Sequence, residues 1–263
     1  MNILKKLKIK KKKSLHEFEG DHIINANSKF NTLESYKVAR TNIMFSLPKS
    51  EEAKIILVSS SEPGEGKTTS SINLAYTFAQ TGAKVLLIDC DMRKPRVHRY
   101  IKISKDIGLS NILCGFTTVE KAIQKKAFGD IDCIPVGEIP LNSAELLMSD
   151  AMKTLLADLS KQYDYIFIDT PPIMTVTDAM IIAPMASGVV LVVRENQSTF
   201  EMVDKTVDLL RRADIKILGF LMTYSQNSAK SRSYGRKYYS RGYYRYGYKY
   251  EYKEDSNTGE TNK

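Results

Sequence analysis

Residues 59–69 hold the densest group of side chains able to do chemistry. They read Ser-Ser-Ser-Glu-Pro-Gly-Glu-Gly-Lys-Thr-Thr and follow a short apolar run that predicts a strand. Two glycines permit the backbone to curl so that successive N–H groups face phosphate oxygens, and the helix predicted to follow adds its positive end. The segment fits a P-loop, although Ser61 stands where the first glycine usually stands. The residues predicted to bind ATP are Gly64, Glu65, Gly66, Lys67, Thr68 and Thr69.

Three aspartates are predicted to meet this loop. Asp89 and Asp91 come at the end of one apolar run, and Asp169 ends another. Residues two apart on an extended chain face the same side, and ligands in open α/β sheets lie beyond the carboxyl ends of the strands. A single aspartate at a strand end is often only a helix cap. Three of them together with a P-loop indicate a Mg²⁺–nucleotide site, in which Asp169 is the candidate to hold a metal-bound water.

The elements that must position these residues are short apolar runs alternating with helical stretches. This alternation predicts an α/β P-loop NTPase fold, with a mostly parallel sheet covered by helices on both faces. Predicted strands are Ile55–Ser59, Val85–Asp89, Ile131–Val136, Tyr165–Asp169, Val189–Val193 and Ile217–Met222. Predicted helices are Leu33–Leu47, capped by Asn31 or Thr32 and ended by Pro48, then Thr68–Thr81, Ser143–Leu159 and Phe200–Arg211.

Charge divides the 263-residue chain into three parts. The net charge is +9, but residues 1–13 contribute +7 and residues 230–263 contribute +5, so that the remaining residues, 14–229, sum to −3. We therefore expect a basic mobile segment over 1–30, a P-loop domain over 31–225 and a flexible tail over 226–263, and no nucleic-acid-binding face on the globular part. No apolar run is long enough to cross a membrane and no signal peptide is recognisable, which predicts a cytoplasmic protein. The cysteines are predicted to be buried free thiols: Cys90, Cys114 and Cys133.

The tail is dense in tyrosines that glycine, arginine and lysine separate, with no periodic apolar face. One interpretation is a set of phospho-acceptors, and the other is a tail that stacks nucleic-acid bases on its rings. The ATP site favours the acceptor interpretation. The candidate acceptors are Tyr234, Tyr238, Tyr239, Tyr243, Tyr244, Tyr246, Tyr248, Tyr250 and Tyr252.

The P-loop, the Ile-Asp-Cys-Asp segment at 88–91 with Arg-Lys-Pro after it, and the Asp-Thr-Pro-Pro segment at 169–172 resemble the bacterial tyrosine kinases of capsule and exopolysaccharide synthesis. Three further stretches are similar to that family, at 108–110, 140–147 and 176–179. The similarity covers roughly residues 31–225. The short chain resembles the form in which the kinase and its transmembrane activator are separate proteins.

The resemblance implies a role for each site residue. Lys67 and Thr68 hold phosphate and Mg²⁺, Asp91 and Asp169 hold the metal directly or through water, and Asp89 is the base toward the tyrosine hydroxyl. The catalytic set is therefore Lys67, Asp89 and Asp91. One departure concerns Thr223, which stands where the family usually carries an asparagine that reads adenine, so that base selectivity is an open question.

The resemblance also implies partners. Glu34, Lys37 and Arg40, spaced by three on a predicted helix, form one stripe that in the family joins subunits into a ring. An ordinary solvated charged face is the alternative. A transmembrane regulator of polysaccharide chain length is implied as activator, which would recruit the kinase to the inner face of the membrane, and a tyrosine phosphatase is implied to reset it.

The competing function is a positioning ATPase of the kind that partitions plasmids or places division sites. Such proteins share the fold but usually carry a lysine directly after the first residue of the loop, where this chain has Glu62. They also lack a tyrosine tail. A non-enzymatic adaptor that binds through its tail is a third alternative.

Overall fold

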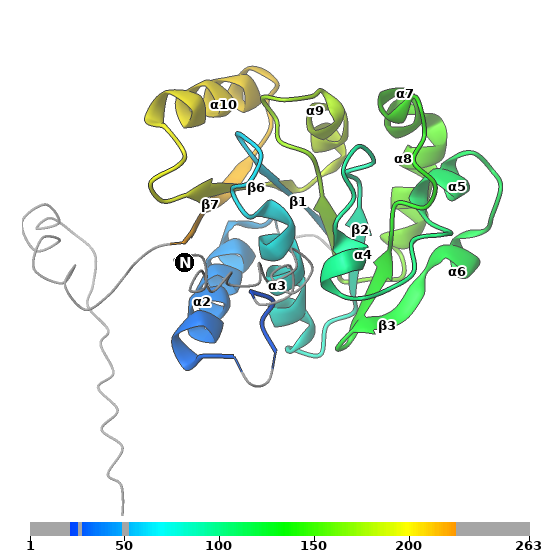
Figure 1. The fold of residues 1–263 in the computed structure, drawn as a ribbon, viewed down its shortest axis with the longest axis horizontal. Coiled ribbons are helices and arrows are strands. Elements are labelled where there is room, and N and C mark those ends of the chain that lie inside the picture. Colours follow the sequence, from blue (N-terminus) through cyan, green and yellow to red (C-terminus); the bar gives the residue numbers. More distant parts are fainter. Residues whose placement is uncertain (1–21, 26–27, 49–52, 225–263) are drawn as a thin grey trace, which may run out of the picture. The chain divides into compact units, whose positions relative to one another are not determined.

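Within the residues that the structure describes, the strands form one seven-stranded sheet (Figure 1). The structure, a computed structural model, describes residues 22–25, 28–48 and 53–224, all within the first of two compact units of the chain, Met1–Ser225. The strand order is β3-β4-β2-β5-β1-β6-β7, and every neighbouring pair is parallel except β3 and β4. The strands are β1 Lys54–Ser60, β2 Val85–Asp89, β3 Gln124–Phe128, β4 Ile131–Ile134, β5 Tyr165–Asp169, β6 Gly188–Arg194 and β7 Ile217–Thr223.

Helices cover both faces of the sheet, which confirms the predicted α/β P-loop architecture. Helices α2 and α3 pack on one apolar core, and a second core on the opposite face takes in α5 and α7 to α10. The helices are α2 Phe30–Ser46, α3 Lys67–Ala79, α4 Val97–Tyr100, α5 Leu109–Leu113, α6 Val119–Ala122, α7 Ser143–Met148, α8 Asp150–Leu159, α9 Asp178–Ile182, the 3-10 turn η1 Ala183–Met185 and α10 Phe200–Arg212.

The parallel pairing of β2 with β5 decides where the site forms. Asp89 lies opposite Asp169 in register, and both strands are buried over their length apart from Tyr165. Since β1 is the next strand after β5, the loop that leaves β1 emerges beside these two carboxylates. The sheet therefore brings together residues that lie up to about a hundred positions apart in the chain.

Several predicted boundaries are wrong. Helix α2 begins at Phe30 after Lys29, and no side chain caps it, so neither Asn31 nor Thr32 is its cap. It ends at Ser46, one residue before the predicted end, because Leu47, which precedes Pro48, is extended. The helix predicted over 143–159 is two helices, since Ser149 leaves the helical conformation and its hydroxyl accepts a hydrogen bond from the Met152 N–H, starting α8.

Strand β3 was not predicted at all. It reads Gln-Lys-Lys-Ala-Phe, with no apolar run, and it holds its place as an edge strand through antiparallel pairing with β4. Residues 22–25 also differ from the expected mobile segment: Ile23 and Ile24 are buried, and the Ile24 N–H donates to Asn73 Oδ1 at 2.9 Å. Among the cysteines, Cys90 and Cys133 are buried free thiols, whereas Cys114 is exposed.

Candidate active site

The P-loop joins β1 to α3 and takes its shape from two glycines. Gly64 and Gly66 have φ angles of 85° and 93°, a region that side chains with a Cβ rarely adopt. The Glu65 carboxylate is fully buried between them and accepts hydrogen bonds from the Glu62 N–H and the Ser198 hydroxyl. The Glu65 side chain thus anchors the loop from within, and only its backbone can face a ligand.

The backbone N–H groups and the carbonyl groups of this loop differ in whether they have partners among the described residues. Over residues 64–69, no backbone N–H donates a hydrogen bond to any group in the part of the chain that the structure describes. The loop carbonyls, by contrast, are bonded: Arg194 donates to the Gly64 oxygen at 2.9 Å and the Thr223 hydroxyl to the Glu65 oxygen at 2.7 Å. A row of free donors at the N-terminus of a thirteen-residue helix is an anion site of the kind that binds phosphate.

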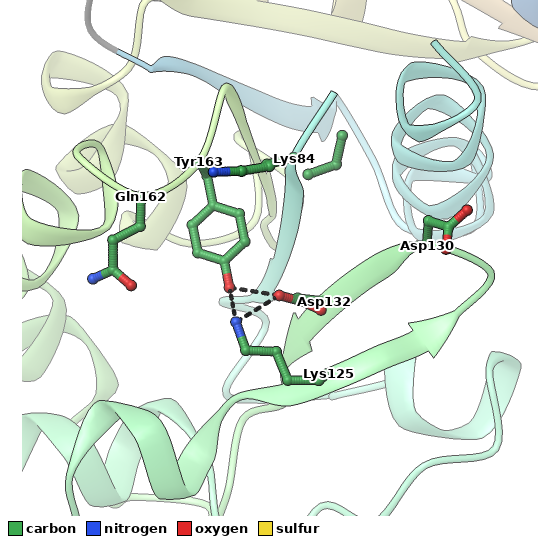
Figure 2. A pocket seen from close by; sticks show the side chains of 7 residues that line it. Lys84, Lys125, Asp130, Asp132, Gln162 and Tyr163 are labelled. Atoms are coloured by element: carbon green, nitrogen blue, oxygen red, sulfur yellow. Dashed lines mark hydrogen bonds and ion pairs between the residues drawn. The ribbon is translucent and has the colours of Figure 1, made fainter. Parts of the chain in front are cut away.

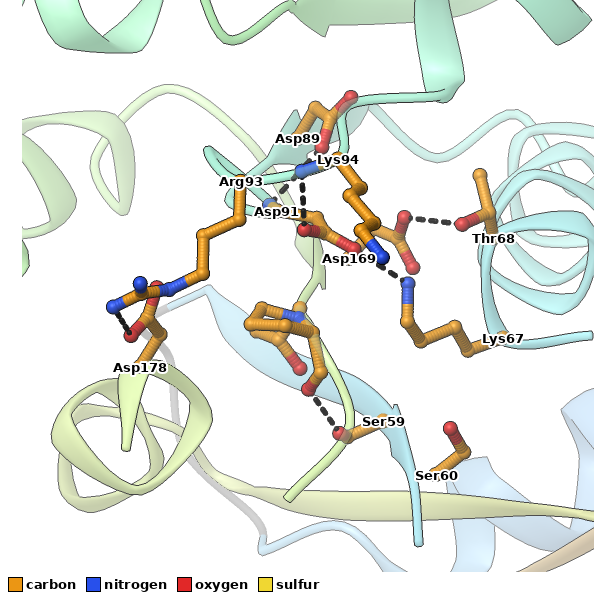
Figure 3. A network of polar contacts seen from close by, with 12 residues as sticks. Ser59, Ser60, Lys67, Thr68, Asp89, Asp91, Arg93, Lys94, Asp169 and Asp178 are labelled. Carbon is orange, nitrogen blue, oxygen red and sulfur yellow. Dashed lines mark hydrogen bonds and ion pairs between the residues drawn. The ribbon is translucent and has the colours of Figure 1, made fainter. Parts of the chain in front are cut away.

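Lys67 and the three predicted aspartates lie together at the carboxyl ends of β2 and β5 (Figure 3). The Lys67 ammonium is 2.8 Å from Asp91 Oδ2, and both side chains are about nine-tenths buried. Thr68 Oγ1 donates to Asp169 Oδ2 at 2.8 Å. Asp89 is fully buried and accepts from the Asp91 N–H at 3.1 Å. We call Lys67, Asp89, Asp91 and Asp169 the carboxyl-end cluster.

The charges of this cluster are unbalanced, because three buried carboxylates face one amine. Burial raises the pKa of Asp89 well above its usual range, and the neighbouring charges of Asp169 and Asp91 raise it further. Burial likewise raises the pKa of Asp169, although Lys67 opposes this shift. Burial alone would lower the pKa of Lys67, but the attraction of Asp169 and Asp91 outweighs it, and the pKa is raised. A site with this excess of negative charge suits a divalent cation.

The side-chain oxygens of this site fit a Mg²⁺ ion that the protein would bind together with a phosphate ligand. They are too few to hold the ion alone. Within the described residues, no three His, Cys, Asp or Glu side chains form a metal-ligand group. Mg²⁺ is usually bound by one or two carboxylates together with phosphate oxygens and water. Asp169 and the Thr68 hydroxyl are adjacent and supply such a partial set, whereas Asp91 is engaged by Lys67 and by the Lys94 N–H.

A pocket of about 270 Å³ lies elsewhere and is not part of this site (Figure 2). It is at the amino ends of β2 and β4, where Lys125, Asp132 and Tyr163 bond one another. Each of these three polar groups already has its partners in the protein. We call Lys125, Asp132 and Tyr163 the amino-end cluster.

Comparisons with known proteins show the family of this chain. Residues 53–213 match the family model described as an AAA domain. The tyrosine-protein kinase YwqD of Bacillus subtilis is 39% identical over 202 residues, which cover 77% of this chain and 84% of that protein. This chain belongs to the bacterial tyrosine-protein kinase family. The resemblance seen in the motifs is thereby confirmed.

Solved structures of related proteins show how far the kinase fold extends. The kinase domain of the Escherichia coli tyrosine kinase ETK is 31% identical, with a TM-score of 0.70 over 82% of this chain and 80% of that one. The cell division ATPase MinD of Pyrococcus furiosus is 27% identical, with a TM-score of 0.57 over 67% of this chain and 74% of that one. The fold is therefore shared with a cell division ATPase, while the more similar of these two structures is a tyrosine kinase domain.

The helix stripe predicted to join kinase subunits is partly engaged within the subunit. Lys37 pairs with Glu34 at 2.7 Å, and both side chains are somewhat over one-third exposed. Arg40 is partly buried and donates to the Thr77 carbonyl oxygen, near the end of α3, at 2.6 Å. The tail tyrosines lie outside the described residues.

Several site residues were not found by motif. Ser71 donates to Asp169 Oδ1 at 2.9 Å, and its place one turn after Thr68 on the same helix face could have indicated this. Arg194 and Ser198 hold the loop from more than 120 residues away, and nothing local indicates them. A bonded group of Arg93, Ser143 and Asp178 also borders the cluster.

Proposed function

We propose that this chain transfers the γ-phosphoryl group of ATP to tyrosine hydroxyls, including those of its own C-terminal cluster. The observation that carries this proposal is the combination of free N–H donors at the start of α3 with Lys67 and three buried carboxylates. The donors suit the phosphates of a nucleotide, and the carboxylates suit its divalent cation. Family membership adds the class of acceptor.

Each residue of the site is proposed to have a separate role in phosphoryl transfer. Bound ATP–Mg²⁺ supplies the phosphoryl group and the divalent charge. The N–H groups of residues 64–69 orient the phosphates, and Lys67 compensates the negative charge that spreads over the transferring group. Thr68, Asp169 and Asp91 would hold Mg²⁺, the two carboxylates directly or through water. Catalysis of this kind depends on positioning and charge more than on covalent chemistry.

Asp89 is proposed to take the proton of the acceptor phenol. Its burial raises its pKa, which makes it a stronger base than an exposed carboxylate. A carboxylate is still a weak base for a phenol with a pKa of about 10. The loose transition state of phosphoryl transfer reduces the demand on the base, since proton loss accompanies transfer and does not have to precede it.

The tail is proposed to act as acceptor and as switch. Residues 230–263 carry a charge of +5, which suits approach to a site with three carboxylates. Each phosphate adds about −1.5 to −2 charges, so that three or four modifications cancel the positive charge of the tail. A strongly anionic tail is repelled from a neighbouring site, and the affinity between subunits falls with the number of phosphates. The domain limits 31–225 and 226–263 remain part of this proposal.

Ring assembly is proposed through the stripe of Glu34, Lys37 and Arg40. A head-to-tail interface that closes makes a ring and brings the tail of one subunit near the site of the next. Exchanging Glu34 and Lys37 (Glu34→Lys with Lys37→Glu) keeps an oppositely charged pair within the helix. It reverses the sign of the charge at each of the two positions. We expect this double variant to lower the oligomeric mass by light scattering. An unchanged oligomer would count against the stripe.

Control of capsular or extracellular polysaccharide synthesis is proposed from the family. A transmembrane regulator of chain length activates the kinase at the inner face of the membrane, and a tyrosine phosphatase resets it. Among the described residues, no helix is long and apolar enough to cross a membrane. Co-purification with a candidate regulator, and its effect on tail phosphorylation, would test this part.

The kinase assignment is tested by incubating the purified protein with ATP and Mg²⁺ and mapping phosphotyrosine by mass spectrometry. Modification between subunits is tested by mixing a Lys67→Met protein that has its tail with an active protein truncated after Ser225. Phosphate on the inactive chain supports transfer between subunits. An unmodified inactive chain in that mixture excludes it. Native mass before and after ATP tests the charge switch, because the oligomer should become smaller.

The alternative, a positioning ATPase, has the shared fold in its favour. Its cross-dimer lysine has no counterpart here, since Glu62 occupies that position and its N–H is tied to Glu65. ATP hydrolysis with no phosphotyrosine on any protein would favour this alternative over the kinase.

A further inference from the structure

Three segments resemble the kinase family but have no function assigned from their sequence motifs. They are 93–95, 140–147 and 176–179. The structure joins one residue from each. Arg93 donates to both carboxylate oxygens of Asp178, from Nε at 3.1 Å and from Nη2 at 3.0 Å. The Ser143 hydroxyl donates to Asp178 Oδ2 at 3.1 Å. Asp178 therefore ties three separate loops together.

Asp178 is well suited to be the fixed member of this group. Its side chain is fully buried, whereas Arg93 is 48% exposed. The loop that leads to it from β5 is fastened to β1, because the Thr170 hydroxyl donates to the Val58 oxygen at 3.0 Å and Ser59 donates to the Pro171 oxygen at 2.9 Å. Arg93 is thus held against a frame that also carries the P-loop.

The two loops held by Asp178 both border the carboxyl-end cluster. Arg93 lies two residues after Asp91 and next to Lys94, whose N–H donates to Asp91 Oδ1 at 3.0 Å. Ser143 follows a loop that the segment at 108–110 fixes from the other end, since the Ser110 hydroxyl donates to the Glu138 oxygen at 2.6 Å. Gly108 permits that contact, because a Cβ there would lie 2.1 Å from the Pro135 oxygen.

The position of this group relative to the P-loop indicates which substrate it serves. Arg93 and Asp178 lie on the far side of Asp91 from Lys67 and Thr68 (Figure 3). In phosphoryl transfer the attacking and leaving oxygens are roughly in line on opposite sides of the phosphorus. With the nucleotide bound at the P-loop as proposed above, ADP departs on that side, and we expect the acceptor hydroxyl to enter on the side of Arg93 and Asp178.

The same side offers surfaces that fit a basic, tyrosine-bearing segment. Ile139, Leu141 and Met174 are apolar and 54%, 107% and 38% exposed, and they belong to the two loops that the Ser143–Asp178 bond connects. Glu138 and Glu145 are exposed in the same region of the chain. Apolar side chains suit a phenol ring, and the acids suit a tail whose charge is +5.

We propose that Asp178 is a positioning residue for the acceptor tyrosine: by holding Arg93 and Ser143 it fixes the loops 91–96 and 138–143, against which the tyrosine-bearing segment of a second copy docks. The proposal rests on the tyrosine kinase function proposed above. It assigns Asp178 no contact with the nucleotide, because Asp178 acts only through its two partners.

The test compares acceptor and nucleotide in the full-length protein. The acceptor probe is a synthetic peptide with the sequence of residues 234–252, and the nucleotide is a fluorescent ATP analogue with Mg²⁺. Because loss of loop positioning on the scale of 1 Å can cost about a hundredfold in rate, we expect Asp178→Asn to raise the peptide KM by about tenfold or more. The nucleotide Kd should stay within about twofold, since the P-loop contacts are not altered.

Two controls separate positioning from general loss of structure. Asp132→Asn is a matched change at the amino-end cluster, where the aspartate also binds a cationic side chain and a hydroxyl, and it should leave the peptide KM unchanged. Arg93→Lys keeps the positive charge but loses the bidentate hydrogen bond to Asp178. It should raise the peptide KM less than Asp178→Asn does. The double variant Arg93→Lys with Asp178→Asn should be no worse than Asp178→Asn alone.

The outcomes are distinct. A wild-type kinase that phosphorylates the peptide, with an Asp178→Asn variant of unchanged peptide KM, overturns the inference and leaves the kinase intact. Equal losses of nucleotide and peptide binding, or additive effects in the double variant, also overturn it. If Asp178→Asn does not fold, Ser143→Ala must raise the peptide KM or the inference fails. A wild-type protein that never phosphorylates the peptide overturns the proposed function first.

Discussion

Two lysine–carboxylate clusters lie at opposite ends of the same sheet, and they differ in what they leave unsatisfied. In the carboxyl-end cluster one lysine faces three buried carboxylates, and the adjacent N–H groups of the P-loop have no acceptor among the described residues. In the amino-end cluster one lysine faces one aspartate, and Tyr163 bonds to both. The first is incomplete without a ligand, whereas the second is complete within the protein.

This difference teaches where function resides in the molecule. Both clusters are polar, and the pocket of about 270 Å³ belongs to the amino-end cluster. The groups of that cluster that line this pocket already have partners in the protein, so the pocket by itself does not indicate a ligand site. Unbalanced charge and unused donors point to the carboxyl end, where open α/β sheets bind their ligands.

The largest expected effect comes from replacing each lysine in turn. Lys67→Met should reduce tyrosine phosphorylation by about 10²–10³-fold or more, because a charge aimed at the transferring group is lost. Lys125→Met is the matched change at the other cluster and should leave phosphorylation at the wild-type level. Phosphotyrosine per subunit after a fixed incubation with ATP and Mg²⁺ measures both. Near wild-type modification in Lys67→Met protein would show that the assigned site is wrong.

How much of this contrast the sequence could predict depends on how local each signal is. The P-loop residues are consecutive, and Asp89 and Asp169 end apolar runs, so a parallel sheet alone brings them together. The amino-end cluster could not be predicted, because β3 carries two lysines and no apolar run. Its position depends on pairing with β4, which only the folded chain reveals.

Contacts between distant residues escaped prediction for the same reason. Arg194 holds the Gly64 carbonyl across 130 residues, and Arg93 meets Asp178 across 85. Arg40 was predicted to be part of a stripe that meets another subunit, and its bond within the subunit to a carbonyl near the end of α3 was not foreseen. A long polar side chain can reach several different partners, and the sequence does not indicate which one it bonds. The packing of the folded chain determines that partner.

The second effect concerns Asp169 and couples stability to function. Asp169→Asn should raise the stability of the nucleotide-free protein, because burial raises the pKa of Asp169 and its charged form is therefore disfavoured in the folded state. An amide fits the site, since its NH₂ can donate to Ser71 while Ser71 donates to the Lys67 carbonyl oxygen. Phosphorylation should fall sharply in the same variant. Thermal unfolding without nucleotide, together with the phosphotyrosine assay, measures both changes.

The pH dependence gives the sign of this effect. Because burial raises the pKa of Asp169 in the folded state, folding binds protons there, and the wild type loses stability as pH rises from the usual carboxyl range through that raised pKa. The Asp169→Asn variant lacks this loss. Its advantage in melting temperature should therefore grow with rising pH. A constant advantage from acid to neutral pH would contradict the raised pKa.

The Asp132→Asn variant is expected to change stability less than Asp169→Asn does, and in the opposite direction. Burial alone would raise the pKa of Asp132, but hydrogen bonds from Lys125, the Lys126 N–H and Tyr163 hold it below its usual value. The charged form thus contributes stability that is present above the ordinary carboxyl pKa and is lost as pH falls through the lowered one. Asp132→Asn should cost about 1 kcal/mol at neutral pH and nothing at strongly acid pH. If Asp132→Asn instead stabilised the protein at neutral pH, the two clusters would not differ in the sign of their contribution to stability.

The smallest effect is expected from Tyr163→Phe, which removes one hydroxyl and leaves the ring in the core. Lys125 and Asp132 keep their pair at 2.8 Å, so neither loses its last partner. The cost should be about 0.5 kcal/mol, or about 1–2 °C in melting temperature, with phosphorylation unchanged. Burial raises the pKa of Tyr163 in the folded state, and the contribution of its neutral hydroxyl is fully present below the ordinary tyrosine pKa. That contribution is lost as pH rises through the raised value, so the difference between Tyr163→Phe and the wild type should shrink in alkaline solution. A large loss of phosphorylation in Tyr163→Phe would mean that the amino-end cluster is linked to the active site across the sheet, and that the two ends are not independent.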